Sequence, residues 1–201
     1  MRGLGAIGAG PDHISAYALI VEEGTRLAAR IKRGEIAPPD DDEMADSYLA
    51  ADKLFGAAGM SWYEVSNWAS GPDAACRHNL LYWTGGNWWG VGPGAHSHVG
   101  GIRWWNVRHP SAYASRIAAG ASPGQAREVL TGTERRTERI LLETRLASGC
   151  PRSLLGPEGQ RAAASAVADG LAESAAFAAG RVVLTPAGRL LADAVIRGLT
   201  D

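Results

Sequence analysis

The sequence predicts an α/β fold followed by a helical, winged-helix-like module. A near-continuous apolar run at residues 13–21 is typical of a strand buried on both faces. A helical pattern and a second strand follow, in the strand–helix–strand order of a parallel sheet with a right-handed crossover. From Pro110 onward helical patterns dominate, with one short strand before the last helix.

The first elements follow from local start and stop residues. Residues 1–12 are rich in glycine and alanine and predict no regular element, whereas residues 26–32 suit a short helix. Two prolines and three acids at residues 38–42 predict a helix start, because acids stabilise the positive end of a helix. Apolar residues from Met44 to Ala58 recur at helical spacing, and Gly59 is a plausible stop. Residues 61–68 predict one strand.

The later elements are predicted in the same way. Thr131 and Glu134 have the spacing of a capping box, and Thr185 with Pro186 is typical of a helix start. We expect helices at 110–119, from 131 to about 149, from 157 to 170 and after 185, with a short strand at 181–184. This order resembles a winged-helix module.

Composition excludes several classes of protein. The 201 residues allow one large domain, or part of one with a small second domain. No apolar run reaches about 18 residues, and the N-terminus lacks the apolar core of a signal peptide, so we expect no transmembrane segment and a cytoplasmic location. The net charge of -1 and the ten arginines against nine acids from Arg127 onward give no basic surface for nucleic acid.

Cysteine is scarce. The two cysteines, Cys76 and Cys150, leave one disulfide open but do not indicate secretion. An iron–sulfur cluster takes about three or four thiolates, so this chain has too few for one.

Tryptophan is concentrated, since all seven lie between Trp62 and Trp105. Indoles bury a large area and carry one N–H group that needs a partner. The segment therefore predicts an aromatic core, a subunit face or a pocket for a flat ligand.

Two polar clusters lie within this segment. Residues 76–83, CRHNLLYW, offer a thiol and an imidazole that could ligate haem iron, with Tyr82 and Trp83 to stack on a porphyrin; the alternative is a surface turn whose His78 caps a helix. Residues 90–98, GVGPGAHSH, are a weak match to a phosphate loop. His96 and His98 would share a strand face and, with Cys76 and His78, make an uncommon zinc set.

A third group of polar residues ends the predicted strand at 61–68. Glu64, Ser66 and Asn67 occupy the carboxyl end, where ligand sites of parallel sheets often lie. The alternative is that they hydrogen-bond to neighbouring loops.

Together these motifs resemble the coproporphyrinogen-oxidase-like radical-SAM family, and within it the HemW-type haem chaperones. The resemblance rests on residues 13–17, 23–25, 62–69, 76–79, 82–83, 92–97 and 184–185 with Gly188, so it covers nearly the whole chain. It implies that residues 1–109 are the late strands and helices of an incomplete (β/α) radical-SAM barrel, including the Trp-rich segment. Residues 110–201 would be the helical HemN-type C-terminal domain.

The resemblance also implies site residues. The family's haem-associated motif is present as His78, Asn79, Tyr82 and Trp83, with Cys76 close by. On the S-adenosyl-L-methionine side, alignment of motifs places Ile20, Gly92, Gly94 and His96 near the contacts.

One departure from the family changes the expected function. Family members carry Cys-x-x-x-Cys-x-x-Cys for a 4Fe-4S cluster, and this chain lacks it, so we expect no radical chemistry from the chain alone. The resemblance implies a truncated HemW-like protein that binds haem and delivers it to respiratory haem proteins. The alternatives are a fragment of an oxygen-independent coproporphyrinogen III oxidase, or a non-enzymatic interaction module. An incomplete barrel would expose apolar surface, so we expect association with itself or with a missing N-terminal half.

Overall fold

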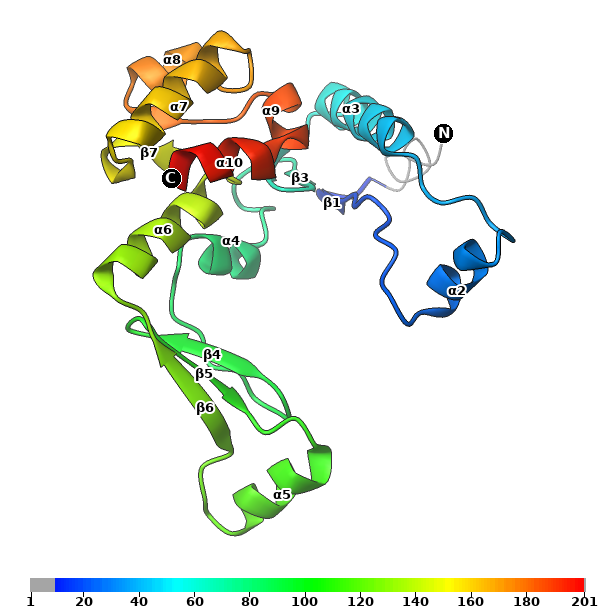
Figure 1. The fold of residues 1–201 in the computed structure, drawn as a ribbon, viewed down its shortest axis with the longest axis vertical. Helices are drawn as coiled ribbons and strands as arrows, with labels where there is room; N and C mark the ends of the chain where they lie inside the picture. The colour runs from blue at the N-terminus through cyan, green and yellow to red at the C-terminus, as the bar shows by residue number, and fades with distance from the viewer. Residues whose placement is uncertain (1–9, 201) are drawn as a thin grey trace. The chain divides into compact units, whose positions relative to one another are not determined.

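The computed structural model describes residues 10–200, which form two compact units that divide between Ala75 and Cys76 (Figure 1). The irregular segment expected at residues 1–12 lies mostly outside this range. Whether the family's domain boundary falls after residue 109 stays a prediction. In the described part of the chain, no helix is both long enough and apolar enough to cross a membrane.

The helices of the first unit form where their end residues predict. They are α2 (Arg26–Lys32) and α3 (Asp41–Ala57). Asp40 caps α3, because its Oδ1 accepts a hydrogen bond of 3.0 Å from the backbone N–H of Glu43. The helix ends at Ala58, followed by Gly59 with a φ of +82°, as the sequence predicts.

The sheet of the first unit differs from the prediction of parallel neighbours. Its strands are β1 (His13–Ser15), β2 (Ser61–Glu64) and β3 (Asn67–Ala69), in the order β1-β3-β2 with both pairs antiparallel. The expected single strand at 61–68 is a hairpin, because Val65 takes a φ of +31° and reverses the chain. Strands β1 and β2 run in the same direction, but β3 lies between them.

The predicted first strand is also too long. Only three residues are extended and paired, and residues 16–22 follow as irregular chain. The side chains expected to be buried on both faces are exposed: Tyr17 by 67%, Leu19 by 58% and Ile20 by 75%. An apolar run predicts burial only if another element covers it, and none of the described residues does so here.

Trp68 is the centre of the first unit's core. It is fully buried, and its indole lies 5.2 Å from the ring of Phe55 and 5.5 Å from that of Tyr48, both on α3. The indole N–H donates to Asp52 Oδ1 at 2.7 Å, so its one polar group is satisfied. The apolar face of α3 therefore packs on the sheet around Trp68, with Ile14 and Trp62 of the neighbouring strands in the same cluster.

The second unit begins with α4 (Arg77–Trp83) and a three-stranded antiparallel sheet. Strands β4 (His96–Val99), β5 (Ile102–Asn106) and β6 (Gly124–Val129) lie side by side in that order (Figure 1). Helix α5 (Pro110–Ala118), predicted from the sequence, connects β5 to β6.

A helical module with a two-stranded wing completes the second unit. Its elements are α6 (Gly132–Glu143), β7 (Cys150–Pro151), the 3₁₀ turn η1 (Arg152–Leu154), α7 (Pro157–Ala168), α8 (Ser174–Ala178), β8 (Arg181–Val182), α9 (Pro186–Leu190) and α10 (Ala192–Thr200). Helix α10 packs on α7 and α6 around a core that includes Ile140, Val182 and Leu199 (Figure 1). The architecture is the mixed α/β fold with a winged-helix-like module that the sequence predicts.

Two helix boundaries in this module differ from the prediction. The Thr131 capping box forms, but α6 ends at Glu143 and not near Gly149. The last helix is divided at Leu191 into α9 and α10. A Cβ atom on Gly188 would lie 1.8 Å from the backbone oxygen of Leu171, so α9 packs against the chain more closely than a side chain allows.

Replacing Gly188 tests this close approach. The substitution Gly188→Ala must displace α9 from Leu171, so we expect a loss of about 1–3 kcal/mol in the free energy of unfolding. Denaturant unfolding followed by circular dichroism measures it. Gly132→Ala is the matched control, since nothing lies within 4 Å of its added Cβ. Equal stability of the two variants would contradict the packing described.

The exposed apolar side chains after β1 predict self-association. The double substitution Leu19→Ser and Ile20→Ser removes apolar surface that is 58% and 75% exposed. We expect the average mass from light scattering to rise with concentration for the unaltered chain and to rise less for the variant. A constant monomer mass for the unaltered chain at high concentration would show this expectation to be wrong.

Candidate functional site

The seven-residue helix α4 carries the first part of the site. His78 and Tyr82 lie one helical turn apart and therefore share a face. Their ring centroids are 4.5 Å apart at an interplanar angle of 75°, an edge-to-face contact. His78 is exposed and Tyr82 is 38% exposed, so solvent and ligands reach both rings.

Trp88 and His98, which lie outside α4, extend this pair into a row of four contacting rings. Trp88 meets Tyr82 edge-to-face, with centroids 4.6 Å apart, and His98 of β4 lies 4.9 Å from Trp88. The backbones of Trp88 and His98 exchange two hydrogen bonds, of 2.8 and 3.0 Å. We call His78, Tyr82, Trp88 and His98 the ring cluster.

His98 is the buried end of the ring cluster, with 7% of its surface exposed. Its Nδ1 lies 2.8 Å from the backbone oxygen of Gly86. A carbonyl oxygen only accepts, so this contact places the proton on Nδ1 and leaves Nε2 as the acceptor in the neutral ring. The same contact fixes the turn that separates α4 from Trp88.

The backbone of the glycine-rich segment that follows is hydrogen-bonded to three side chains that were not among the predicted site residues. The backbone N–H of Gly90 donates to Ser97 Oγ at 2.9 Å, and that of Gly92 donates to Tyr113 Oη at 3.2 Å. Asn106 donates its side-chain amide to the Gly92 oxygen at 3.0 Å. Much of the segment's backbone is therefore already engaged by protein groups.

The structure brings together only part of the predicted haem motif. Cys76 is the residue before α4, and Asn79 and Trp83 lie on α4 itself. The ring contacts of the ring cluster within the described residues do not include Trp83. Trp88 and His98 were missing from the predicted haem site. Trp88 and His98 are ten positions apart and pair through one isolated β-bridge. No local sequence pattern predicts such a bridge.

The predicted S-adenosyl-L-methionine contacts are divided between the two units. Ile20 belongs to the first unit, and Gly92, Gly94 and His96 belong to the second. His96 is exposed and stacks on Trp105, with centroids 5.7 Å apart. Their role as a common site stays a prediction.

The two cysteines differ in environment, and in the part of the chain that the structure describes they are not joined by the disulfide that the sequence left open. Cys150 is fully buried, and burial raises the pKa of its thiol to about 11, with the negative charge of Glu143 acting in the same direction. Among residues 10–200, no group of three histidine, cysteine or acidic side chains is placed to hold a metal, so the zinc set is not assembled.

The polar residues at the hairpin of the first unit form a buried network. Glu64 and Asn67 are 1% and 0% exposed, and the Asn67 amide donates to the carboxylate of Glu64 and to Tyr17 Oη. Ser15 donates to the Asn67 side-chain oxygen. The network ties β1 to the hairpin and gives the buried Glu64 and Asn67 hydrogen-bond partners; the Ser66 side chain is not part of it.

The fold defines a class of protein. The structure superposes on the coproporphyrinogen III oxidase HemN of Escherichia coli, described as a radical SAM enzyme, with a TM-score of 0.69 over 98% of this chain and 50% of that one. At 15% sequence identity this likeness establishes a shared fold and no more.

The relatives give the family. The chain is 51% identical over 194 residues to the haem chaperone HemW of Mycobacterium tuberculosis, covering 96% of this chain and 49% of the relative. It is 33% identical over 146 residues to HemW of Synechocystis, with 72% and 35% covered. No family model matches. The chain belongs to the HemW-type family within the coproporphyrinogen-oxidase-like radical-SAM proteins, and it spans about half the length of the Mycobacterium relative and about a third of the Synechocystis one.

Alkylation tests the difference between the two thiols. At pH 8 a thiol with a pKa of about 11 is ionised in about one molecule in a thousand, and the thiolate is the reactive form. Iodoacetamide should label partly exposed Cys76 in the folded protein and leave Cys150 unmodified, as read by peptide mass spectrometry. In denaturant both should react. Labelling of Cys150 at the rate of Cys76 in the folded chain would contradict its burial.

Proposed function

We propose that this chain binds haem at the ring cluster, with His78 as the iron ligand, and that it belongs to a protein that passes haem to respiratory haem proteins. The observation that carries the proposal is the exposed imidazole of His78 held by the edge of Tyr82. The relatives in Mycobacterium tuberculosis and Synechocystis are named as haem chaperones, which supports haem as the ligand.

The ring cluster suits a ligand that is flat and contains iron. A neutral imidazole nitrogen is a common axial ligand of haem iron. The packing of His78 against Tyr82, and of Tyr82 against Trp88, restricts the orientations of the imidazole before any ligand arrives. Partly exposed Tyr82 and Trp88 offer ring surface to a porphyrin.

Exposure of the site favours delivery over storage. His78 and Tyr82 are both exposed, so a haem ligated by His78 would be open to solvent. Affinity differences arise mostly in the dissociation rate, so an open site with one ligand releases haem readily. Cys76, next to α4, is a further thiol within the same segment.

The residues of this chain do not fit a 4Fe-4S cluster. The chain has two cysteines, one of them is buried with a raised pKa, and such a cluster takes about three or four thiolates. No step of radical chemistry is therefore assigned to these residues, and oxidation of coproporphyrinogen is not proposed for the chain. We also propose that the protein is located in the cytoplasm.

Haem titration tests the proposal. Adding haemin to the unaltered chain should give a saturable shift of the Soret band. His78→Ala removes the ligand and should weaken binding about tenfold or more, while Tyr82→Phe keeps the ring and should have a small effect. The measurement is absorbance at fixed protein concentration.

The matched control is His109→Ala, since His109 is also exposed and sits at the start of helix α5. We expect its titration curve to match that of the unaltered chain. Identical Soret shifts in the His78 and His109 variants would overturn the assignment of His78. The absence of any saturable shift in the unaltered chain would overturn haem binding itself.

A further inference from the structure

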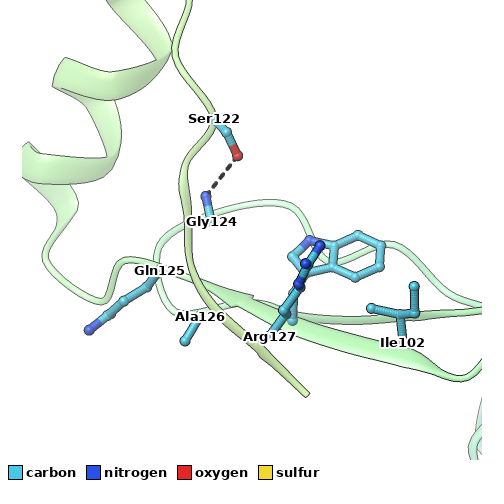
Figure 2. A pocket seen from close by; sticks show the side chains of 7 residues that line it. Ile102, Ser122, Gly124, Gln125, Ala126 and Arg127 are labelled. Carbon is cyan, nitrogen blue, oxygen red and sulfur yellow. Dashed lines mark hydrogen bonds between the residues drawn. The ribbon is translucent and has the colours of Figure 1, made fainter. Parts of the chain in front are cut away.

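A groove on the β4–β5–β6 sheet is not used by the proposed haem site. It has a volume of about 430 Å³ and is lined by Ile102 and Trp104 of β5, Gln125 and Arg127 of β6, and Ser122 before β6 (Figure 2). This volume lies within the range of small-molecule sites, about 300–1,000 Å³. Figure 2 shows Ile102 and Arg127 projecting to the same side of the strands.

The strand register separates this groove from the ring cluster. Trp104 pairs with Arg127 and Ile102 with Val129, and residues opposite each other share a face. His98 pairs with Arg103, the neighbour of Trp104 on β5, so His98 and Trp104 point to opposite faces of the sheet. A ligand in the groove would therefore lie across the sheet from His98.

The groove is aromatic on one side. Trp104 contacts Trp89 edge-to-face, with centroids 4.9 Å apart and an interplanar angle of 76°, and Trp89 is 72% exposed. Trp89 lies outside the residues that line the groove and supports the Trp104 indole, which offers aromatic surface to a planar ring in the groove. Ile102, 38% exposed, adds aliphatic surface to the groove.

The groove is positive on its other side. Arg127 is exposed, and among the described residues it forms no ion pair. The described lining residues include no carboxylate. The nearest acid along the strand, Glu128, points to the other face and pairs with Arg103 at 3.2 Å. A second cation, Arg116, donates to the backbone oxygen of Gly124 at the end of the groove.

We infer that this groove binds a planar aromatic ligand that carries a carboxylate, with the ring on Trp104 and the carboxylate on Arg127. Charge complementarity selects this occupant, since an unpaired arginine in a groove without acids favours an anion. The guanidinium offers several N–H donors in a plane that matches a carboxylate. Binding here needs no iron and no histidine, so the inference goes beyond the proposed function and does not depend on it.

A metal-free porphyrin tests the groove without the iron site. The probe is protoporphyrin IX, which is planar, carries two carboxylates and has no iron for His78 to ligate. Its fluorescence anisotropy, measured against increasing concentrations of the full chain, should rise and saturate. Arg127→Gln should weaken binding about fivefold, because it removes one charge-assisted contact at an exposed position.

Three further variants make the test specific. Gln125→Glu places a carboxylate of nearly the same shape among the exposed lining residues and should also weaken binding. Arg197→Gln removes an exposed arginine of α10, remote in sequence, and should leave binding unchanged. The loss of affinity caused by Arg127→Gln should be the same with and without His78→Ala, because the groove and His98 lie on opposite faces of the sheet, which distinguishes a failure of this inference from a failure of the haem proposal. Circular dichroism confirms that each variant folds.

Several results would overturn the inference. One is equal affinity of the Arg127 and Arg197 variants for the porphyrin. Another is equal affinity of the unaltered chain for the porphyrin and its dimethyl ester, which lacks the carboxylates. A third is occupation of the groove by a second copy of the chain, seen as a sedimentation mass that falls in Arg127→Gln while porphyrin affinity stays the same.

Discussion

The pairing of Trp88 with His98 is the contact on which the arrangement of the candidate site depends. Two backbone hydrogen bonds close the glycine-rich segment of residues 89–97, and the centroids of the two rings lie 4.9 Å apart. Through Tyr82 the same pairing fixes α4 beside β4, and through Gly86 it fixes the turn between them. A helix of seven residues is too short to be stable by itself, so α4 depends on this contact and on its packing against α6.

The sequence predicts helices well because their signals are local. Asp40 and Thr131 accept hydrogen bonds from their own first turns, and Gly59 takes the left-handed conformation that ends α3. These contacts join residues three or four apart, so they can be recognised without the fold. The C-terminal end of α6 and the division of the last helix carry no such local signal and were not predicted.

Strand pairing and the site are harder to predict because they are not local. The hairpin at residues 61–69 depends on Val65 adopting a positive φ, which a β-branched residue rarely does, so no turn was expected. His78 and Tyr82 could be placed together from their spacing on a helix. Trp88 and His98 could not, since an isolated bridge has no periodic pattern. The groove depends on which residues of β5 and β6 face each other, and that register is absent from either strand alone.

Gly90 limits how this segment can vary. A Cβ atom at this position would lie 2.1 Å from the backbone oxygen of His96, so every other amino acid would push β4 away from the loop. Its neighbour Val91 is 82% exposed and meets no such limit. We therefore expect almost no substitution to be tolerated at Gly90 and nearly all to be tolerated at Val91. A library with every amino acid at each position of this segment would show which residues the folded site restricts.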